Sequence, residues 1–309
     1  MARRFFRAAA LLLALVASSG CAVGTIFGRN LAVLGHSPKA VPNKIKDPVR
    51  RDARIAVLWV GHATALVQID DKFILTDPVF TQTVGQLSRR LVEPGIEVAN
   101  LPPIDLVLIS HMHFDHLSVG SLDLLEPKVK QLLVPQGGLV YVPNYRFPTD
   151  EIARWKSVDV AGLRVTAVPV RHHAFRYGAD VAWLTTTFTG WVVEYHGKTV
   201  YFGGDTAYDR DNFVSTAARF PNIDVALIPI APVHPREMMR RSHVDPPEAL
   251  QAFVDLGAKH MVPIHYDTFE NSLDAPGEAL QILRDTMAAR GIGSEGVHIL
   301  PIGGQLAIP

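Results

Sequence analysis

The chain has 309 residues, of which 48% are hydrophobic and 19% are charged, a composition typical of a globular protein with a substantial core. Lysine and arginine together number 30, and so do aspartate and glutamate, so no net charge attracts nucleic acid and no nucleic-acid partner is expected. The single cysteine excludes disulfides within the chain. Composition gives no indication of the oligomeric state.

The first twenty residues have the pattern of an export signal. Three arginines precede an apolar run at residues 8–17, which is too short to span a membrane comfortably, and small residues then lead to Cys21. Bacterial lipoproteins carry their lipid on a cysteine in this position. Residues 1–20 are therefore predicted to be a lipoprotein-like signal, with Cys21 as the lipid attachment site. This prediction places the protein in the bacterial cell envelope, anchored on the periplasmic face, whereas a plain cleaved signal or an uncleaved anchor is the alternative.

Residues 21–53 show no clear period, contain three prolines and carry an excess of basic side chains. They are expected to form the lipid anchor and a linker to a single hydrolase-like domain at residues 54–309. The basic side chains would be weakly attracted to anionic headgroups, or would simply belong to a solvated linker.

From residue 54 onward, short strands rich in β-branched residues alternate with helices. Strands are expected at residues 55–60, 64–69, 73–75, 106–109, 163–170, 187–195, 199–202, 225–230, 261–264, 298–300 and 305–308. Helices are expected after Ser118, which could cap the first of them, and at residues 246–256 and 276–290. This order predicts one mixed α/β domain with two sheets between helical layers.

A long connection at residues 77–103 has little regular pattern, and a connection of this length is more often functional than a plain linker. It could close over the site as a lid or form a groove for an acyl chain. The apolar residues that would line such a groove are Phe80, Leu87, Leu91 and Val92. The alternative is that these side chains only pack the loop down.

The strongest chemical signal is the motif His111-Met112-His113-Phe114-Asp115-His116 after a predicted buried strand. In a tight loop, this spacing lets the first two histidines point one way and the aspartate and last histidine point to a second position nearby. Imidazole and carboxylate are ligands that Zn²⁺ prefers. Three more candidates each follow a predicted strand, namely His172, Asp205 and His265. The pattern predicts a site for two metal ions, as opposed to unrelated surface histidines.

These residues resemble the metallo-β-lactamase superfamily over about residues 54–308. The matching segments are Gly61-His62-Ala63-Thr64, Thr76-Asp77-Pro78, His111 to His116, Phe202-Gly203-Gly204-Asp205-Thr206 and Pro263-Ile264-His265. The resemblance implies an α/β fold, a four-layer αββα sandwich with two Zn²⁺ ions, or other divalent metals, at the edge of its sheets. It implies that one ion is held by His111, His113 and His172 and the other by Asp115, His116 and His265, with Asp205 bridging both.

Four further segments resemble the N-acylphosphatidylethanolamine-hydrolysing phospholipases D and their bacterial relatives. They are Trp59 to Thr64, Leu101 to Asp105, Asp224 to Ile230 and Ser242 to Pro246. The resemblance implies a phosphodiesterase of phospholipase D type acting on N-acylphosphatidylethanolamine-like phospholipids. Two zinc ions would lower the pKa of a bridging water and deliver hydroxide to phosphorus. A lipid anchor would place such a site next to its membrane substrate. The short N-terminal region departs from the pattern of this group.

Five residues receive individual roles. Asp205 would bridge the ions and take the proton of the nucleophile. Asp115 and His243 are also expected to be catalytic residues. The resemblance suggests that His243 reaches the substrate or the leaving group, unless it caps local backbone. Asp77 is expected to accept a hydrogen bond from a ligand imidazole, or else to form a plain Asp-Pro turn. His62 is expected to be structural or to support a ligand rather than to bind a metal.

Two other functions fit the same residues. A lactonase or other ester hydrolase would use the same ligands on a carbonyl, and only the pocket would separate it from a phosphodiesterase. A non-catalytic metal-binding envelope lipoprotein is the other alternative, although structural zinc sites are usually closed by four ligands. True β-lactamase activity is the least expected, because many enzymes with that activity carry cysteine where this chain has Asp205.

Overall fold

A computed structural model describes residues 22–309 except residues 23, 34, 86–87, 175 and 178–186. The expected signal at residues 1–20, the expected attachment site Cys21 and Leu87 of the expected groove lie outside the described residues. Among the residues that are described, no helix is long and apolar enough to cross a membrane.

The first sheet has seven strands in the order β15-β1-β2-β3-β6-β7-β8. They are β1 (Ile55–Gly61), β2 (Thr64–Ile69), β3 (Lys72–Thr76), β6 (Leu106–Leu108), β7 (Leu132–Pro135), β8 (Thr149–Ile152) and β15 (Gln305–Ile308). The first three strands form an antiparallel meander, and β6, β7 and β8 continue the sheet in parallel. β15 pairs antiparallel with β1, so the last strand of the domain lies beside the first.

The second sheet has six strands in the order β14-β13-β12-β11-β10-β9. They are β9 (Ser157–Val160), β10 (Leu163–Val168), β11 (Gly190–Tyr195), β12 (Lys198–Phe202), β13 (Val225–Pro229) and β14 (His260–Ile264). β12, β13 and β14 run parallel to one another. β10 and β12 are both antiparallel to β11, so β10 runs in the same direction as this parallel group.

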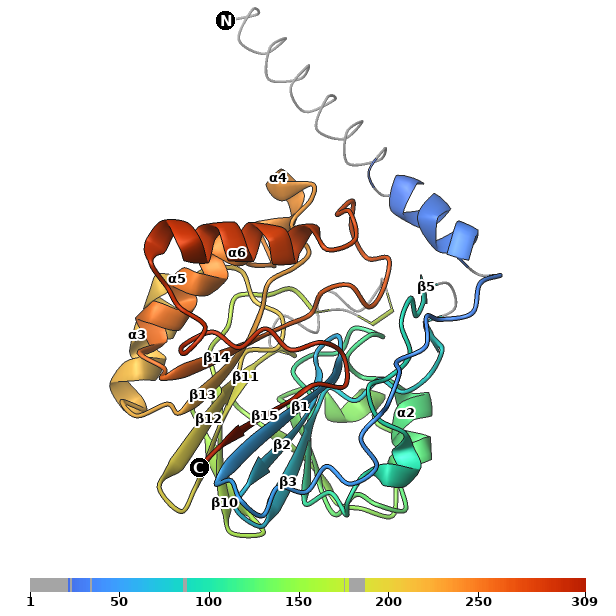
Figure 1. Ribbon diagram of the computed structural model, residues 1–309. Helices are drawn as coiled ribbons and strands as arrows, with labels where there is room; N and C mark the ends of the chain where they lie inside the picture. Colours follow the sequence, from blue (N-terminus) through green and yellow to red (C-terminus); the bar gives the residue numbers. More distant parts are fainter. Residues whose placement is uncertain (1–21, 23, 34, 86–87, 175, 178–186) are drawn as a thin grey trace, which may run out of the picture.

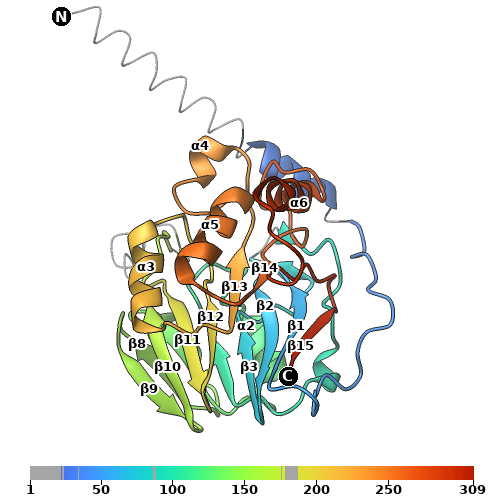
Figure 2. The ribbon, with the colours of Figure 1, turned by 60° about the vertical axis from the view of Figure 1, so that its left-hand side comes forward.

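The two sheets face each other, and helices cover their outer faces (Figures 1 and 2). The covering helices are α2 (Val119–Leu125), α3 (Arg210–Arg219), α5 (Pro246–Leu256) and α6 (Glu278–Arg290), whereas the short α4 (Arg236–Met239) lies at one end of the domain. Alternation along β1 divides the core: Ile55, Val57 and Trp59 join the cluster between the sheets, whereas Leu58 and Val60 join the cluster under α2. The expected αββα sandwich is confirmed.

Some expected elements differ from the structure. Residues 298–300 do not form a strand, and Val297 makes only an isolated bridge with Met261. Ser118 does precede α2, but its hydroxyl lies 2.8 Å from the Ser121 hydroxyl and makes no capping bond to the helix backbone. The connection at residues 77–103 contains β4 (Thr83–Val84), β5 (Ser88–Arg89) and the short 3-10 helix η1 (Val98–Asn100).

The segment after Cys21 is not a featureless linker, because residues 24–33 form a helix that packs on the domain. Arg29 donates to the carbonyl oxygen of Asp274 at 3.0 Å, and the Asn30 side chain donates to that of Glu270 at 2.7 Å. The helix is drawn in blue in Figure 1. Its contacts fall on the loop that follows β14, one of the strands that carry the predicted ligands.

Candidate metal centre

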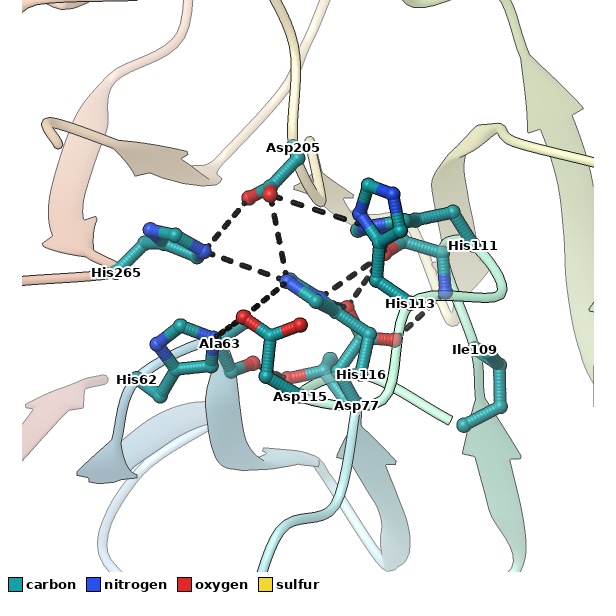
Figure 3. A network of polar contacts seen from close by, with 12 residues as sticks. His62, Ala63, Asp77, Ile109, His111, His113, Asp115, His116, Asp205 and His265 are labelled. Atoms are coloured by element: carbon teal, nitrogen blue, oxygen red, sulfur yellow. Dashed lines mark hydrogen bonds and ion pairs between the residues drawn. The ribbon is translucent and has the colours of Figure 1, made fainter. Parts of the chain in front are cut away.

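The structure brings the seven predicted ligands together at one edge of the two sheets. The His111–His116 motif follows β6, and His172, Asp205 and His265 follow β10, β12 and β14. Because β10, β12 and β14 run in one direction, their carboxyl ends share an edge, and the first sheet supplies the histidine motif opposite it. Figure 3 shows the side chains of the histidine motif together with Asp205 and His265. No single element could provide this set of donors.

Three imidazoles form a first set. The donor atoms of His111, His113 and His172 all lie within 4.8 Å of one another. His111 Nε2 is 2.8 Å from His113 Nδ1, and His172 Nε2 is 3.5 Å from the same nitrogen. The Nδ1 atom of His172 lies 2.9 Å from the carbonyl oxygen of Ser242, so it carries the proton and leaves the Nε2 lone pair facing the other two rings.

A second set lies beside the first. The donor atoms of Asp115, His116 and His265 lie within 4.8 Å of one another, and His62 belongs to the same group. His116 Nε2 and His265 Nε2 are 3.3 Å apart. The resemblance assigned these two sets to two separate ions, and that assignment stays a prediction.

Asp205 lies between the two sets. Its Oδ1 is 3.0 Å from His265 Nε2, and its Oδ2 is 3.3 Å from His116 Nε2 and 3.9 Å from His111 Nε2 (Figure 3). Gly204 permits this approach: it has a φ of +56°, and a Cβ there would lie 2.2 Å from the Ser110 Cβ. One carboxylate can therefore reach both metal positions.

The donor set fits divalent cations. Among the described residues, Asp205 Oδ1 is buried without a hydrogen-bond partner, and so are His265 Nδ1 and His243 Nδ1. Burying a polar atom without a hydrogen-bond partner costs free energy of folding. Here a carboxylate and several imidazole nitrogens converge, and few of them carry a proton that a neighbour could accept. Cations at the two positions would satisfy the Asp205 oxygen and the imidazole nitrogens that face it, and nitrogen with oxygen donors suits Zn²⁺.

The Asp77 side chain supports the cluster through hydrogen bonds to Ser110 and His116. The Asp77 carboxylate is fully buried. Its Oδ1 accepts from the backbone N–H of Ser110 at 2.6 Å, and its Oδ2 accepts from the Ser110 hydroxyl at 2.5 Å and from His116 Nδ1 at 2.6 Å. The last contact places the His116 proton on Nδ1 and directs Nε2 toward the metal position. A plain Asp-Pro turn would not make these contacts.

His62 and His243 also lie within the cluster. His62 Nε2 is 3.0 Å from Asp115 Oδ2, and its side chain is 1% exposed. His243 Nδ1 is 3.6 Å from Asp205 Oδ2, and its side chain is 14% exposed. Asp245, rather than His243, caps α5, and His243 Nδ1 has no hydrogen-bond partner among the described residues.

Burial and mutual proximity shift the protonation of the cluster. Burial lowers the pKa of His62 to about 3 and that of His243 to about 4. Burial opposes the ionisation of Asp205, but His265 and His116 outweigh it and hold its pKa well below the usual range. Burial likewise opposes the charging of His116, but Asp205 foremost raises its pKa well above the usual value. Metal binding must therefore displace a proton from His116, because only the neutral imidazole is a ligand.

A pocket of about 960 Å³ opens onto His113 and Asp115. Its wall is largely apolar and includes Val84, Phe114, Val119, Tyr177 and Phe269, together with Asn30 of the N-terminal helix. This pocket differs from the groove that the sequence suggested. Phe80 packs in the core under α2, and Leu91 and Val92 line a second pocket of about 470 Å³ that reaches His62 and His265.

Arg176 is a pocket residue that the sequence did not reveal. It is 7% exposed and lines the larger pocket. Its guanidinium donates to the carbonyl oxygens of Met112 and Leu117 at 3.1 and 2.8 Å and lies 4.3 Å from the Phe114 ring centre. It therefore holds both ends of the metal-binding loop. Its two partners lie 64 and 59 residues away in the sequence, so no local signal indicates it.

Comparison with known proteins agrees with this geometry. A family model described as "Beta-lactamase superfamily domain" matches residues 72–266. An uncharacterized protein of Mycobacterium tuberculosis is 33% identical over 290 residues, which cover 88% of this chain and 74% of that protein. The N-acyl-phosphatidylethanolamine-hydrolyzing phospholipase D 1 of Caenorhabditis elegans is 28% identical over 246 residues, covering 74% of this chain and 68% of that protein. A metal-dependent hydrolase of Methanoregula boonei is 31% identical over 230 residues, covering 74% of this chain and 90% of that protein.

The family match extends over more than half of the chain and includes every predicted ligand. The histidine and aspartate clusters at the shared sheet edge supply the metal donors that such a hydrolase requires. The chain belongs to the metallo-β-lactamase superfamily and is a metal-dependent hydrolase.

Proposed function

We propose that the chain is a zinc-dependent phosphodiesterase of phospholipase D type that acts on N-acylphosphatidylethanolamine-like phospholipids. The observation that carries this proposal is the largely apolar pocket of about 960 Å³ that opens onto His113 and Asp115. Burying an acyl chain there would stabilise the complex by about 0.8 kcal/mol for each methylene removed from water. The name of the Caenorhabditis elegans relative supports the same substrate class.

Two zinc ions would be held by the two sets of donors. The first set is His111, His113 and His172, the second is Asp115, His116 and His265, and Asp205 serves both. When bound, the ions would lower the pKa of an attacking water and stabilise the negative charge that develops at phosphorus.

The remaining chemistry belongs to the protein's own side chains. In hydrolysis, a bond forms between the water oxygen and phosphorus, and the bond from phosphorus to the ethanolamide oxygen breaks. Asp205 reaches both donor sets and takes the proton of the water. His243 is 3.6 Å from Asp205 and partly exposed, so it hydrogen-bonds the leaving oxygen and passes the proton to it. Asp115 lines the pocket and positions the reacting group beside the second donor set.

The membrane is the proposed partner. Residues 1–20 would act as a lipoprotein-like signal, and Cys21 would carry the lipid on the periplasmic face of a bacterial envelope. The helix at residues 24–33 follows at once, and it contributes Asn30 to the pocket wall. Phe27 and Leu31 on this helix are 48% and 46% exposed. An anchor at Cys21 would therefore hold the mouth of the pocket beside the bilayer.

The proposal is tested with the purified, zinc-loaded full chain in ¹⁸O-labelled water. The substrates are an N-acylphosphatidylethanolamine, the matched diacyl phosphatidylethanolamine, a soluble aryl phosphodiester and an acyl lactone. We expect the first substrate to be hydrolysed fastest, with the label in phosphatidate and none in the released ethanolamide, because water attacks phosphorus. Hydrolysis of the lactone alone, or label in the ethanolamide, would overturn the proposal.

A further inference from the structure

His62 occupies the tight turn between β1 and β2, and its backbone is tied to the opposite sheet. Its φ is +55°, in the left-handed region. Its carbonyl oxygen accepts from the indole N–H of Trp59 and from the backbone N–H of His265, both at 2.9 Å. Its own N–H donates to the Thr268 hydroxyl at 2.8 Å. These hydrogen bonds connect His62, beside the first sheet, to the loop of the second sheet that carries His265.

The His62 side chain contacts the second donor set. Its Nε2 lies 3.0 Å from Asp115 Oδ2. Its ring lies 4.0 Å from the His265 ring, centre to centre, at an interplanar angle of 38°. The Phe269 ring packs edge-on against the His62 ring, with the two ring centres 5.1 Å apart. With a further ring contact to His116, at 5.0 Å between centres, His62 touches all three predicted ligands of one metal position, and these ligands come from loops of different sheets.

The first donor set has separate supports. His172 is held by the Ser242 carbonyl at 2.9 Å, and His111 Nδ1 lies 2.9 Å from the Ser110 hydroxyl. Loss of the His62 imidazole would leave these contacts in place. The same loss would remove the contact that orients the Asp115 carboxylate. The Asp115 side chain is 24% exposed and therefore less confined than the buried imidazoles.

We propose that His62 is a positioning residue that sets the affinity of the second metal position and leaves the first position unaffected. Its Nε2–H donates to Asp115 and orients that carboxylate toward the position shared with His116 and His265. The inference rests on the two-ion site of the proposed function. Removing a partner that orients a metal ligand typically lowers metal affinity by about 10–100-fold.

The test measures metal binding rather than turnover. The full chain is stripped of metal and titrated with Zn²⁺ by calorimetry, with a competing chelator for the tighter step. We expect His62→Ala to weaken one of the two binding steps by about 10–100-fold and to leave the other within about twofold. His62→Gln should recover most of the loss, because its amide N–H can still donate to Asp115 whereas an amide is a poor zinc ligand.

Two further variants control for folding and for histidine loss. Asparagine tolerates left-handed backbone but is too short to reach Asp115, so His62→Asn should weaken the same binding step as His62→Ala without disturbing the turn. His260→Ala removes a partly buried imidazole on β14 that contacts His298 and the Glu295 carbonyl, and both binding steps should stay unchanged. Circular dichroism confirms that each variant is folded.

The outcomes separate this inference from the proposed function. A wild-type chain that binds a single zinc ion would refute the two-ion site itself. A wild-type chain that binds two ions would leave that site intact and put only His62 to the test. Equal loss of both steps in His62→Ala, no loss in either step, or failure of His62→Gln to recover binding would then overturn the role of His62.

Discussion

Replacing Asp77 by asparagine should impair metal binding through a change of tautomer at His116. The Ser110 backbone N–H lies 2.6 Å from Asp77 Oδ1 and needs an acceptor, so the oxygen of the new amide takes that place. The amide nitrogen then faces His116 Nδ1, which is 2.6 Å from Oδ2 in the native site. Because an amide N–H cannot accept a hydrogen bond, the neutral imidazole of His116 that a metal requires would carry its proton on Nε2. That nitrogen lies 3.3 Å from Asp205 Oδ2, and once protonated it has no lone pair for a metal.

The magnitude follows from the contacts that are lost. The carboxylate makes two charge-assisted bonds besides the one to the Ser110 backbone, at 2.5 Å to the Ser110 hydroxyl and 2.6 Å to His116. At about 1.5 kcal/mol or more each, their loss lowers the free energy of unfolding of the metal-free protein by about 3 kcal/mol. A domain stabilised by about 5–15 kcal/mol stays folded after such a loss. Zinc affinity should fall by about 10–100-fold.

The assay combines urea unfolding of the metal-free protein with zinc titration. Asp105→Asn is the matched control, because Asp105 is 4% exposed and contacts the Phe73 N–H and the Lys130 amine at the start of β6, away from the ligands. The control should lose stability while binding zinc as the wild type does. Unchanged zinc affinity in Asp77→Asn, or an equal loss in the control, would refute the tautomer argument.

Four other predictions concern the metal ligands, the bound ions, the pocket and the anchor. His111→Ala and Asp205→Asn should each abolish measurable turnover yet keep the native circular dichroism spectrum; activity in both variants would contradict the assigned site. Chelation should lower Tm and added zinc should restore it, since zinc at a hundred times its Kd contributes about 2.7 kcal/mol. Tyr177→Ala removes a 57% exposed side chain at the pocket and should lower kcat/KM for a long-chain phospholipid by about tenfold, whereas Val254→Ala, equally exposed on α5, should leave it unchanged. Cys21→Ser should release the protein from the membrane fraction, as measured by cell fractionation.

Much of the metal centre could be predicted because its ligands sit at recognisable places. His172, Asp205 and His265 each follow a short apolar strand, and strands that run in one direction bring their ends to one edge. A hydrogen bond from a ligand imidazole to Asp77 was also expected, with a plain Asp-Pro turn as the alternative. The contacts of His62 with Asp115 and His265 were not predicted. A turn between two strands gives no indication of which loops will cover it.

Other features gave no local signal. Strand β8 has no fully buried residue and α3 buries only Phe213 and Thr216, so neither shows the apolar alternation or period that reveals an element. The pocket wall depends on contacts between distant parts of the chain. Asn30 bonds a carbonyl 240 residues away, and Arg176 bonds one 64 residues away. Such contacts exist only after the sheets have come together.

The pairing of β15 with β1 has a consequence for how the protein is made. While the chain is being synthesised, β1 has a free edge with unpaired backbone groups until residues 305–308 have left the ribosome. The nascent domain therefore cannot complete its first sheet, and the export machinery proposed to capture residues 1–20 would meet an incompletely folded domain. His265, the last predicted ligand, also emerges late. Under the proposed export, the polypeptide would be delivered unfolded, and folding and metal loading would follow.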